Sequence, residues 1–118
     1  MIAIDWVFKA PTYFSSLKLD GQLIGTAEFQ HIQDEAQIID IQIKLDYRRQ
    51  GYGQTLLEAM LQIAQELKCI KALLEVRSKN TPAVQLYQKN SFVINGLRKG
   101  YYRDDDALLM VCFFNSGL

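Results

Sequence analysis

The chain has 118 residues, a length that suits one hydrophobic core, so we expect residues 1–118 to form a single domain. Hydrophobic residues make up 49% of the chain and charged residues 22%, which is typical of a folded globular protein and excludes a disordered one. The 13 Lys and Arg residues are balanced by 13 Asp and Glu residues, which argues against direct nucleic-acid binding as the main function.

The two cysteines, Cys69 and Cys112, lie beside or among apolar residues, and we expect them to be buried free thiols. Apolar runs in the sequence are much shorter than the roughly 18 residues of a membrane span. The first residues, Met1 to Trp6, lack the basic and apolar regions of a signal peptide. We therefore expect a cytoplasmic protein without a membrane partner.

The first half of the chain predicts a hairpin, a further strand and a helix. Two β-prone runs between Thr12 and Phe29 flank Asp20-Gly21, which is a strong hairpin signal. Residues 36–45 alternate between isoleucine or leucine and polar positions, which indicates a strand. From Gly53 the apolar residues recur at three- and four-residue steps, as on one face of a helix.

The second half predicts two parallel strands joined by that helix, then a second helix and two final strands. Residues 70–76 read as a buried strand, and a strand–helix–strand order implies parallel pairing. Thr81-Pro82 provides an N-cap and a proline at the first position of a helix that runs to about Lys89. The last strands are expected at 92–97 and 107–114, joined by the polar segment 103–106. The fold class is therefore α/β or α+β with a mixed sheet.

A glycine-containing turn, residues 48–55 (R-R-Q-G-Y-G-Q-T), lies between the predicted strand and helix. Gly51 and Gly53 let the backbone approach a ligand, and the first amide N–H groups of the helix are unpaired. These donors, the helix dipole and two arginines suit a pyrophosphate. The dinucleotide-binding fingerprint fails because position 56 is Leu56, and the P-loop spacing and lysine are absent. Taken alone, the G-x-G pattern is equally compatible with a plain strand-to-helix turn.

Three blocks of sequence at matching spacing resemble the GNAT superfamily of N-acetyltransferases. The R-x-x-G-x-G of the turn resembles the family's acetyl-coenzyme-A signature, [QR]-x-x-G-x-[GA]. Residues 74–92 resemble its second conserved block, and Tyr101-Tyr102 followed by D-A-L-L-M at 106–110 resembles the bacterial ribosomal-protein-alanine N-acetyltransferases. The match covers roughly residues 38–110. It implies a GNAT-like, centrally parallel mixed sheet flanked by helices, with acetyl-CoA as cosubstrate.

The chain also departs from the family pattern in three places. Only Met1 to Pro11 precede the hairpin, where the family has two helices and often a first strand, so we expect a shortened N-terminus. Ser91 stands where the family usually has glycine, and the connection from Tyr102 to Asp106 is short. Because the first and third departures affect the walls of the acceptor site, the resemblance specifies the acyl donor better than the acceptor.

The resemblance implies three side-chain roles. Glu75 would remove the proton from the amine, directly or through water, and Tyr87 would protonate the coenzyme thiolate. Asn80 would bind the pantetheine arm, and it also suits the turn before a helix. Without the resemblance, Glu75 would be interpreted as a strand-end carboxylate paired with Arg77 or Lys79, and Tyr87 as a core tyrosine.

The resemblance also implies that the coenzyme is bound by the turn and by main-chain groups of the preceding strand, one of which would stabilise the oxyanion. Besides Asn80, the coenzyme-binding residues are expected to be Ile41, Gln42, Ile43, Arg48, Arg49, Gln50, Gly51, Tyr52, Gly53 and Gln54. The only histidine, His31, is expected in a polar connection exposed to solvent, so neither a histidine-activated nucleophile nor a metal site is indicated.

The function implied is direct acetyl transfer from acetyl-CoA to a primary amine, most specifically the N-terminal α-amine of a protein such as a ribosomal protein. Two alternatives stay open. In the first alternative, the acceptor is a small amine or a lysine side chain. In the second, the chain binds coenzyme A without catalysis, and the presence of both Glu75 and Tyr87 argues against this binding-only function. Homodimerisation, which would complete a wall of the acceptor site, is also left open.

Overall fold

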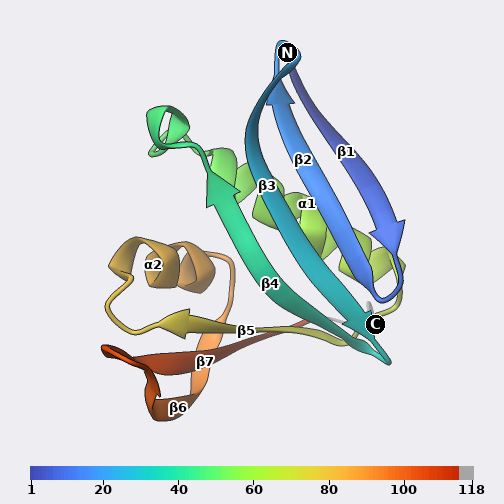
Figure 1. The fold of residues 1–118 in the computed structure, drawn as a ribbon. Coiled ribbons are helices and arrows are strands. Elements are labelled where there is room, and N and C mark those ends of the chain that lie inside the picture. Colours follow the sequence, from blue (N-terminus) through green and yellow to red (C-terminus); the bar gives the residue numbers. More distant parts are fainter. Residues whose placement is uncertain (115–118) are drawn as a thin grey trace.

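One mixed sheet of seven strands organises the molecule, in the order β1-β2-β3-β4-β5-β7-β6 (Figure 1). The computed structural model describes residues 1–114. The strands are β1 (Ile2–Lys9), β2 (Thr12–Leu19), β3 (Gln22–Ile32), β4 (Glu35–Ile43), β5 (Lys71–Arg77), β6 (Val93–Tyr102) and β7 (Asp105–Phe113). The helices are a short 3-10 turn η1 (Leu45–Tyr47), α1 (Tyr52–Glu66) and α2 (Thr81–Lys89). The expected mixed sheet with parallel centre and flanking helices is confirmed.

The first four strands form an antiparallel meander. The β2–β3 hairpin is confirmed, and Asp20 (φ 51°) and Gly21 (φ 84°) form its turn in the left-handed region that such hairpins need. The predicted elements did not include β1, which pairs along its whole length with β2 from Ile2–Leu19 to Lys9–Thr12. The residues before the hairpin are therefore an additional edge strand.

The parallel strands β4 and β5 separate after a short common segment. They pair only at three positions, Glu35–Lys71, Ala36–Ala72 and Gln37–Leu73, although both strands continue further. A register shift in the β3–β4 ladder leaves Ile39 as an extra residue in β4, and such bulges bend a strand. The two strands consequently diverge toward their carboxyl ends (Figure 1). This opening lies in the centre of the sheet.

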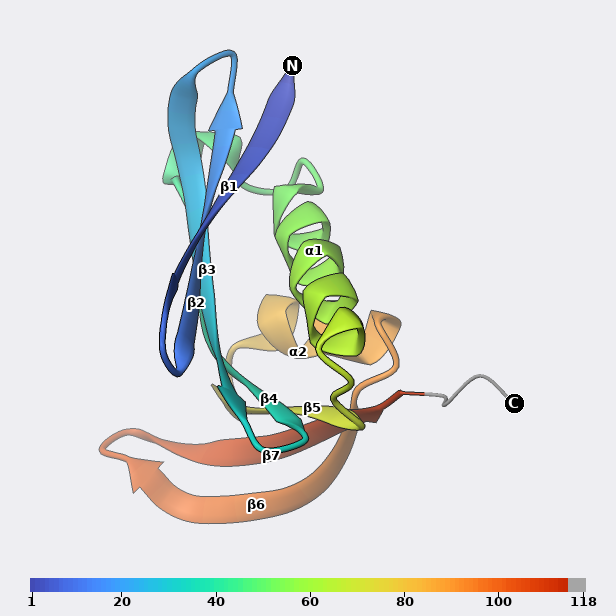
Figure 2. The same ribbon diagram turned by 90° about the vertical axis from the view of Figure 1, so that its right-hand side faces the viewer.

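Both helices lie on the same side of the sheet as one hydrophobic core (Figure 2). The amphipathic α1 buries its apolar residues against β3 and β4. The largest fully buried side chains are Phe29, Phe92, Leu17, Ile24, Leu56, Leu57, Met60 and Met110. Cys69 and Cys112 are buried and free, as predicted. None of the helices within residues 1–114 is long and apolar enough to cross a membrane.

Several predicted boundaries were wrong in ways that affect the site. Strand β4 ends at Ile43, and Leu45 already belongs to η1. Strand β6 continues through Tyr102, and β7 begins at Asp105, so the polar segment contributes only two residues to the turn. His31 lies within β3, paired with Ala36 and half-buried, rather than in an exposed connection.

Candidate coenzyme and acceptor site

The turn before α1 exposes main-chain donors at the start of the helix. Gly51 is the N-cap residue with φ 87°, and no side chain caps the helix. The first helical hydrogen bond runs from Thr55 N to Gly51 O (3.1 Å), so the N–H groups of residues 52–54 have no partner within the described chain. Together with the positive end of the helix dipole, these three N–H groups form an anion-binding end.

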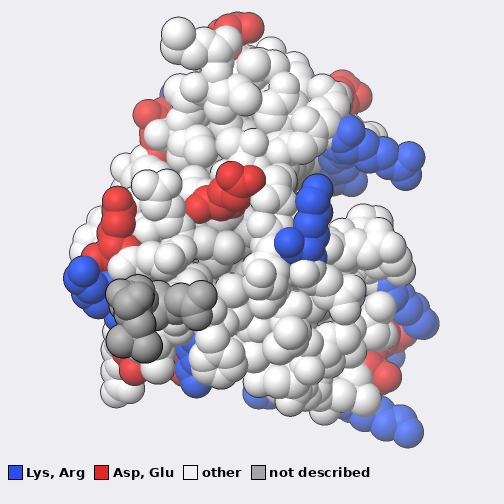
Figure 3. Space-filling model, turned by 180° about the vertical axis from the view of Figure 1, so that it is seen from behind, with Lys and Arg blue, Asp and Glu red and all other residues white. Residues whose placement is uncertain are grey.

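Two side chains of the turn bind the chain just before it, one at the end of β4 and one in η1. Arg48 Nε donates to the Ile43 carbonyl at 2.9 Å, and Gln50 Nε2 donates to the Asp46 carbonyl at 3.2 Å. Arg49 is exposed and has φ 62°, a left-handed conformation outside regular structure. On the helix side of the molecule, Lys and Arg side chains gather where η1 and the start of α1 lie, at the upper right of Figure 3. Positive charge thus lies on the same part of the surface as the start of α1.

The β4–β5 opening begins beyond Gln37 and widens toward this turn. Beyond Gln37, the main-chain groups of β4 that face away from β3 have no partner strand. This part of β4 contains the predicted residues Ile41, Gln42 and Ile43, of which Gln42 pairs with Thr26 on β3 and Ile43 has its carbonyl bound by Arg48. Asn80 lies directly before α2, and its Oδ1 accepts a hydrogen bond from Ala83 N at 3.3 Å. Asn80 therefore caps α2, and within residues 1–114 its side-chain NH₂ group has no hydrogen-bond partner. An extended amide chain fits an opening lined with such donors and acceptors.

Tyr87 lies on α2, in the core on the helix side of the opening. Tyr87 is 9% exposed, and its ring packs edge-on against Phe92 with 5.6 Å between ring centroids. Burial, and secondly the carboxylate of Asp40 on β4, raise the pKa of the Tyr87 phenol to about 12. Within residues 1–114, no group is hydrogen-bonded to the Tyr87 hydroxyl. The phenol is therefore protonated at neutral pH and can donate its proton to a ligand.

Glu75 faces the opposite side of the sheet, in a groove of about 660 Å³. Leu74 and Val76 are buried in the core, so Glu75 between them points away from the helices. Its side chain is 34% exposed, and its Oε1 lies 3.5 Å from Arg98 Nη2. The groove is lined by β4, β5, β6 and β7, through Gln37, Ile38, Ile39, Leu73, Leu74, Glu75, Asn95, Arg98, Tyr101, Tyr102, Leu109 and Met110.

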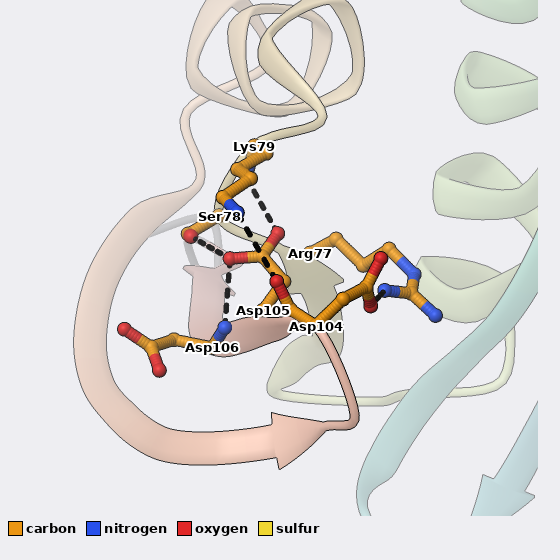
Figure 4. Close-up of polar contacts among 6 residues, drawn as sticks. All are labelled: Arg77, Ser78, Lys79, Asp104, Asp105 and Asp106. Carbon is orange, nitrogen blue, oxygen red and sulfur yellow. Dashed lines mark hydrogen bonds and ion pairs between the residues drawn. The ribbon is translucent and has the colours of Figure 1, made fainter.

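The alternative interpretation of Glu75, as a partner of Arg77 or Lys79, is wrong. Arg77 forms its ion pair with Asp104, and Lys79 Nζ donates to the Asp104 carbonyl at 3.1 Å (Figure 4). Glu75 therefore forms its ion pair with Arg98, a residue for which the sequence analysis predicted no role. The Glu75–Arg98 ion pair depends on how β5 and β6 align with β7. A short sequence motif does not predict that alignment.

The loop after β5 is tied to the β6–β7 turn by carboxylates (Figure 4). Asp105 accepts hydrogen bonds from Ser78 Oγ and, at 2.8 Å, from Lys79 N. The Arg77 hydrogen bond lowers the pKa of Asp104, and the Ser78 hydrogen bond lowers that of Asp105. The short connection expected from the sequence is therefore a tight turn that fixes one end of the groove. Within residues 1–114, no three His, Cys, Asp or Glu residues are placed to hold a metal ion.

Relatives of known name resemble the chain over most of its length. The [ribosomal protein bS18]-alanine N-acetyltransferase of Escherichia coli K12 is 33% identical over 98 residues, which are 80% of this chain and 66% of that protein. An N-alpha-acetyltransferase of Saccharolobus solfataricus is 40% identical over 112 residues, 93% of this chain and 58% of that protein. The chain thus spans slightly less than two thirds of the length of these relatives.

Solved structures agree with the fold. The crystal structure of the E. coli ribosomal-protein-S18-alanine N-acetyltransferase has a TM-score of 0.84 and 29% identity, covering 94% of this chain and 76% of that one. An acetyltransferase from Bacillus anthracis in complex with acetyl coenzyme A has a TM-score of 0.83 and 27% identity, covering 92% and 66%. Residues 2–92 match the model of the Acetyltransferase (GNAT) family. The chain belongs to the Acetyltransferase (GNAT) family.

Proposed function

We propose that this chain transfers the acetyl group of acetyl-CoA directly to the N-terminal α-amine of a protein, with a ribosomal protein that begins with alanine as the acceptor type. The observation that supports the proposal is the separation of β4 and β5 beyond Gln37 and Leu73, because it lies between the groove face that contains Glu75 and the helix face that contains Tyr87. A thioester in this opening would have a base on one side and an acid on the other.

The donor end is assigned to the turn before α1. The free N–H groups of residues 52–54, the Gly51 backbone and the exposed Arg49 supply the hydrogen bonds and charge that a pyrophosphate requires. The main-chain groups of the Ile41 to Ile43 segment that face away from β3, apart from the Ile43 carbonyl bound by Arg48, would hydrogen-bond the pantetheine amides together with the Asn80 side chain. The Gln54 side chain is occupied by Asn90, so Gln54 would contribute its main-chain N–H.

The chemistry follows from the roles assigned to Glu75 and Tyr87. A peptide α-amine has a pKa of roughly 7.7 to 8.0, so most of it is protonated at neutral pH, and Glu75 would accept that proton, directly or through water. The amine nitrogen then attacks the thioester carbonyl while a β4 N–H stabilises the oxyanion. The C–S bond breaks, Tyr87 gives its proton to the sulfur, and the proton lost by the new amide nitrogen returns through water to the Tyr87 phenolate. The products are an amide and a free thiol.

The protein acceptor is inferred from the two named groups of relatives and from the shape of the groove. The E. coli relative is named for the alanine of bS18, and the archaeal one for α-amines. The groove runs across four strands and ends at Tyr101 and Tyr102, which leaves room for several residues of an extended peptide. Ribosomal acceptors would place the protein in the cytoplasm.

An acceptor panel with a thiol-release assay tests this proposal. It should contain an alanine-led peptide, the same peptide with a blocked N-terminus and an internal lysine, and a small polyamine. We expect turnover with the free α-amine peptide and little with the other two. Preferential turnover of the lysine or the polyamine would show a different acceptor class, and tight coenzyme binding without any turnover would show a binding module.

A further inference from the structure

The strand registers place two arginines on either side of one small residue. Ala107 on β7 pairs with Arg77 on β5 and with Arg98 on β6, so both arginines project from the groove face in the same row. Ala107 is fully buried and has only a methyl side chain. Because nothing bulky stands between them, a long side chain from β6 can lie across β7 toward β5. This row lies one step from Glu75, which pairs with Leu109.

The two arginines have different partners. Arg77 lies over the ring of Tyr102, at 4.2 Å from its centroid, and is neutralised by Asp104 at the hairpin turn. Arg98 lies 5.4 Å from the ring centroid of Tyr101. Tyr101 belongs to the part of β6 where the pairing with β7 is interrupted by a register shift. Among the described residues, Glu75 is the one carboxylate within ion-pair distance of Arg98. Arg98 thus interacts with a residue of the groove, whereas Arg77 interacts with the β6–β7 turn.

The Glu75–Arg98 pair suits exchange with a ligand. Its N–O distance is 3.5 Å, and the Arg98 side chain is 54% exposed, so each group keeps only a loose hold on the other. Exposed ion pairs of this kind add little to stability. The groove therefore presents an anionic hydrogen-bond acceptor beside a cationic donor, both of which can take new partners at little cost.

We propose that Arg98 is the residue that makes the groove prefer α-amines over other amines, by binding the carbonyl oxygen of the acceptor's first residue. In a peptide N-terminus the amine and that carbonyl oxygen are separated by three covalent bonds, so they present a donor beside an acceptor. This pattern complements Glu75 beside Arg98. A lysine ε-amine or an alkylamine offers the donor alone and leaves the displaced guanidinium without a partner. The inference rests on the proposed function, since it takes Glu75 as the amine-binding base.

The test compares two acceptors on four proteins. The acceptors are alanine amide and ethylamine, which differ in the carbonyl group, and the proteins are wild type, Arg98→Met, Arg98→Lys and Lys99→Met. Lys99 is the exposed neighbour of Arg98 and does not line the groove, so its variant is the matched control for loss of charge. For Arg98→Met we expect kcat/KM for alanine amide to fall about ten- to a hundredfold, mainly through KM, with ethylamine changed less than about threefold. Arg98→Lys should recover part of the loss, and Lys99→Met should match wild type.

The outcomes separate this inference from the function on which it rests. Wild-type turnover of alanine amide with an equal loss for both acceptors in Arg98→Met would overturn the inference and leave acetyl transfer intact, because a general structural defect affects both. An equal rate of wild type on both acceptors would overturn it as well. If wild type binds acetyl-CoA but acetylates neither acceptor nor an alanine-led peptide, the proposed function itself fails.

Discussion

Gln54 in the first turn of α1 and Asn90 directly after α2 exchange two side-chain hydrogen bonds, both of 2.7 Å. Asn90 Nδ2 also donates to the Leu86 carbonyl at 2.8 Å, which continues the contact into α2. The two amides thus join the helix that carries the glycine turn to the helix that carries Tyr87. The donor end and the proposed acid are therefore held at a fixed separation.

Replacing Gln54 by leucine should lower the free energy of unfolding by about 1–3 kcal/mol, because the part-buried Asn90 amide loses its partner. Gln65→Leu is the control, since the Gln65 amide donates only to its own helix, at the Leu61 carbonyl, and is exposed. Urea unfolding of both variants measures the difference. The double variant Gln54→Leu/Asn90→Leu should lose less than the sum of the two single losses. Strict additivity would mean that the two amides do not stabilise each other.

Substitutions at Gly51 and at Gly53 should differ in their effect on the stability of the fold. At Gly51 a Cβ would meet no atom within 4 Å, but φ is 87°, so the cost of Gly51→Val is conformational, about 1–2 kcal/mol. Gly51→Asn should be tolerated better, because asparagine enters this region more readily. At Gly53 a Cβ would make an ordinary 3.6 Å contact with Leu86, so Gly53→Ala should fold normally. Thermal unfolding checks the order, and a Gly51→Val protein as stable as Gly51→Asn would contradict it.

Arg49→Glu should weaken acetyl-CoA binding about tenfold or more, because it places an anion beside the proposed pyrophosphate site. The effect should shrink as salt is added, since Arg49 is exposed. Lys9→Glu makes the same charge change at the end of β1 that lies away from this turn, and it should bind normally. Calorimetry on the three proteins gives the dissociation constants. Equal values for Arg49→Glu and wild type would remove the turn from the binding site.

Much of this donor end could be predicted from the sequence because its signals are local. The turn chemistry of Gly51 and the apolar period of α1 are encoded within a few neighbouring residues. Strand β1 was not predicted, although Ile4 and Trp6 alternate with Asp5. This edge strand is held in the sheet by its hydrogen bonds to β2, and the sequence of β1 alone does not show that pairing. Local signals thus predicted elements better than their pairing.

The groove that contains Glu75 and Arg98 could not be derived in the same way, because it depends on non-local register. Arg98 reaches Glu75 only because β6 and β5 both pair with β7, and because the β6–β7 register shifts twice along the strands. A one-residue difference in the β6–β7 pairing would turn Arg98 to the other face, and one in the β5–β7 pairing would turn Glu75 away from Arg98. Similarly, no local motif predicts that the Gln54 side chain binds Asn90, which lies 36 residues away in the sequence.

Glu75→Gln and Tyr87→Phe should change the pH dependence of kcat/KM in different ways. Glu75→Gln removes the base, so its loss of rate should shrink as pH rises and free amine accumulates. Because the pKa of Tyr87 is raised to about 12, the wild-type phenol keeps its proton from about pH 6 to 9.5 and causes no fall in rate there. The loss in Tyr87→Phe should therefore persist or grow with pH. Parallel profiles for the two variants would refute this division of roles.

Direct transfer to an α-amine is tested most directly by mass spectrometry with acetyl-CoA labelled in its acetyl group. Wild-type protein is incubated with an alanine-led peptide that also contains a lysine, and both the peptide fragments and the intact protein are weighed. We expect one labelled acetyl group on the alanine nitrogen, none on the lysine, and an unlabelled protein at every time point. A label on the lysine, or a labelled protein that passes its acetyl group on to the peptide, would contradict the account.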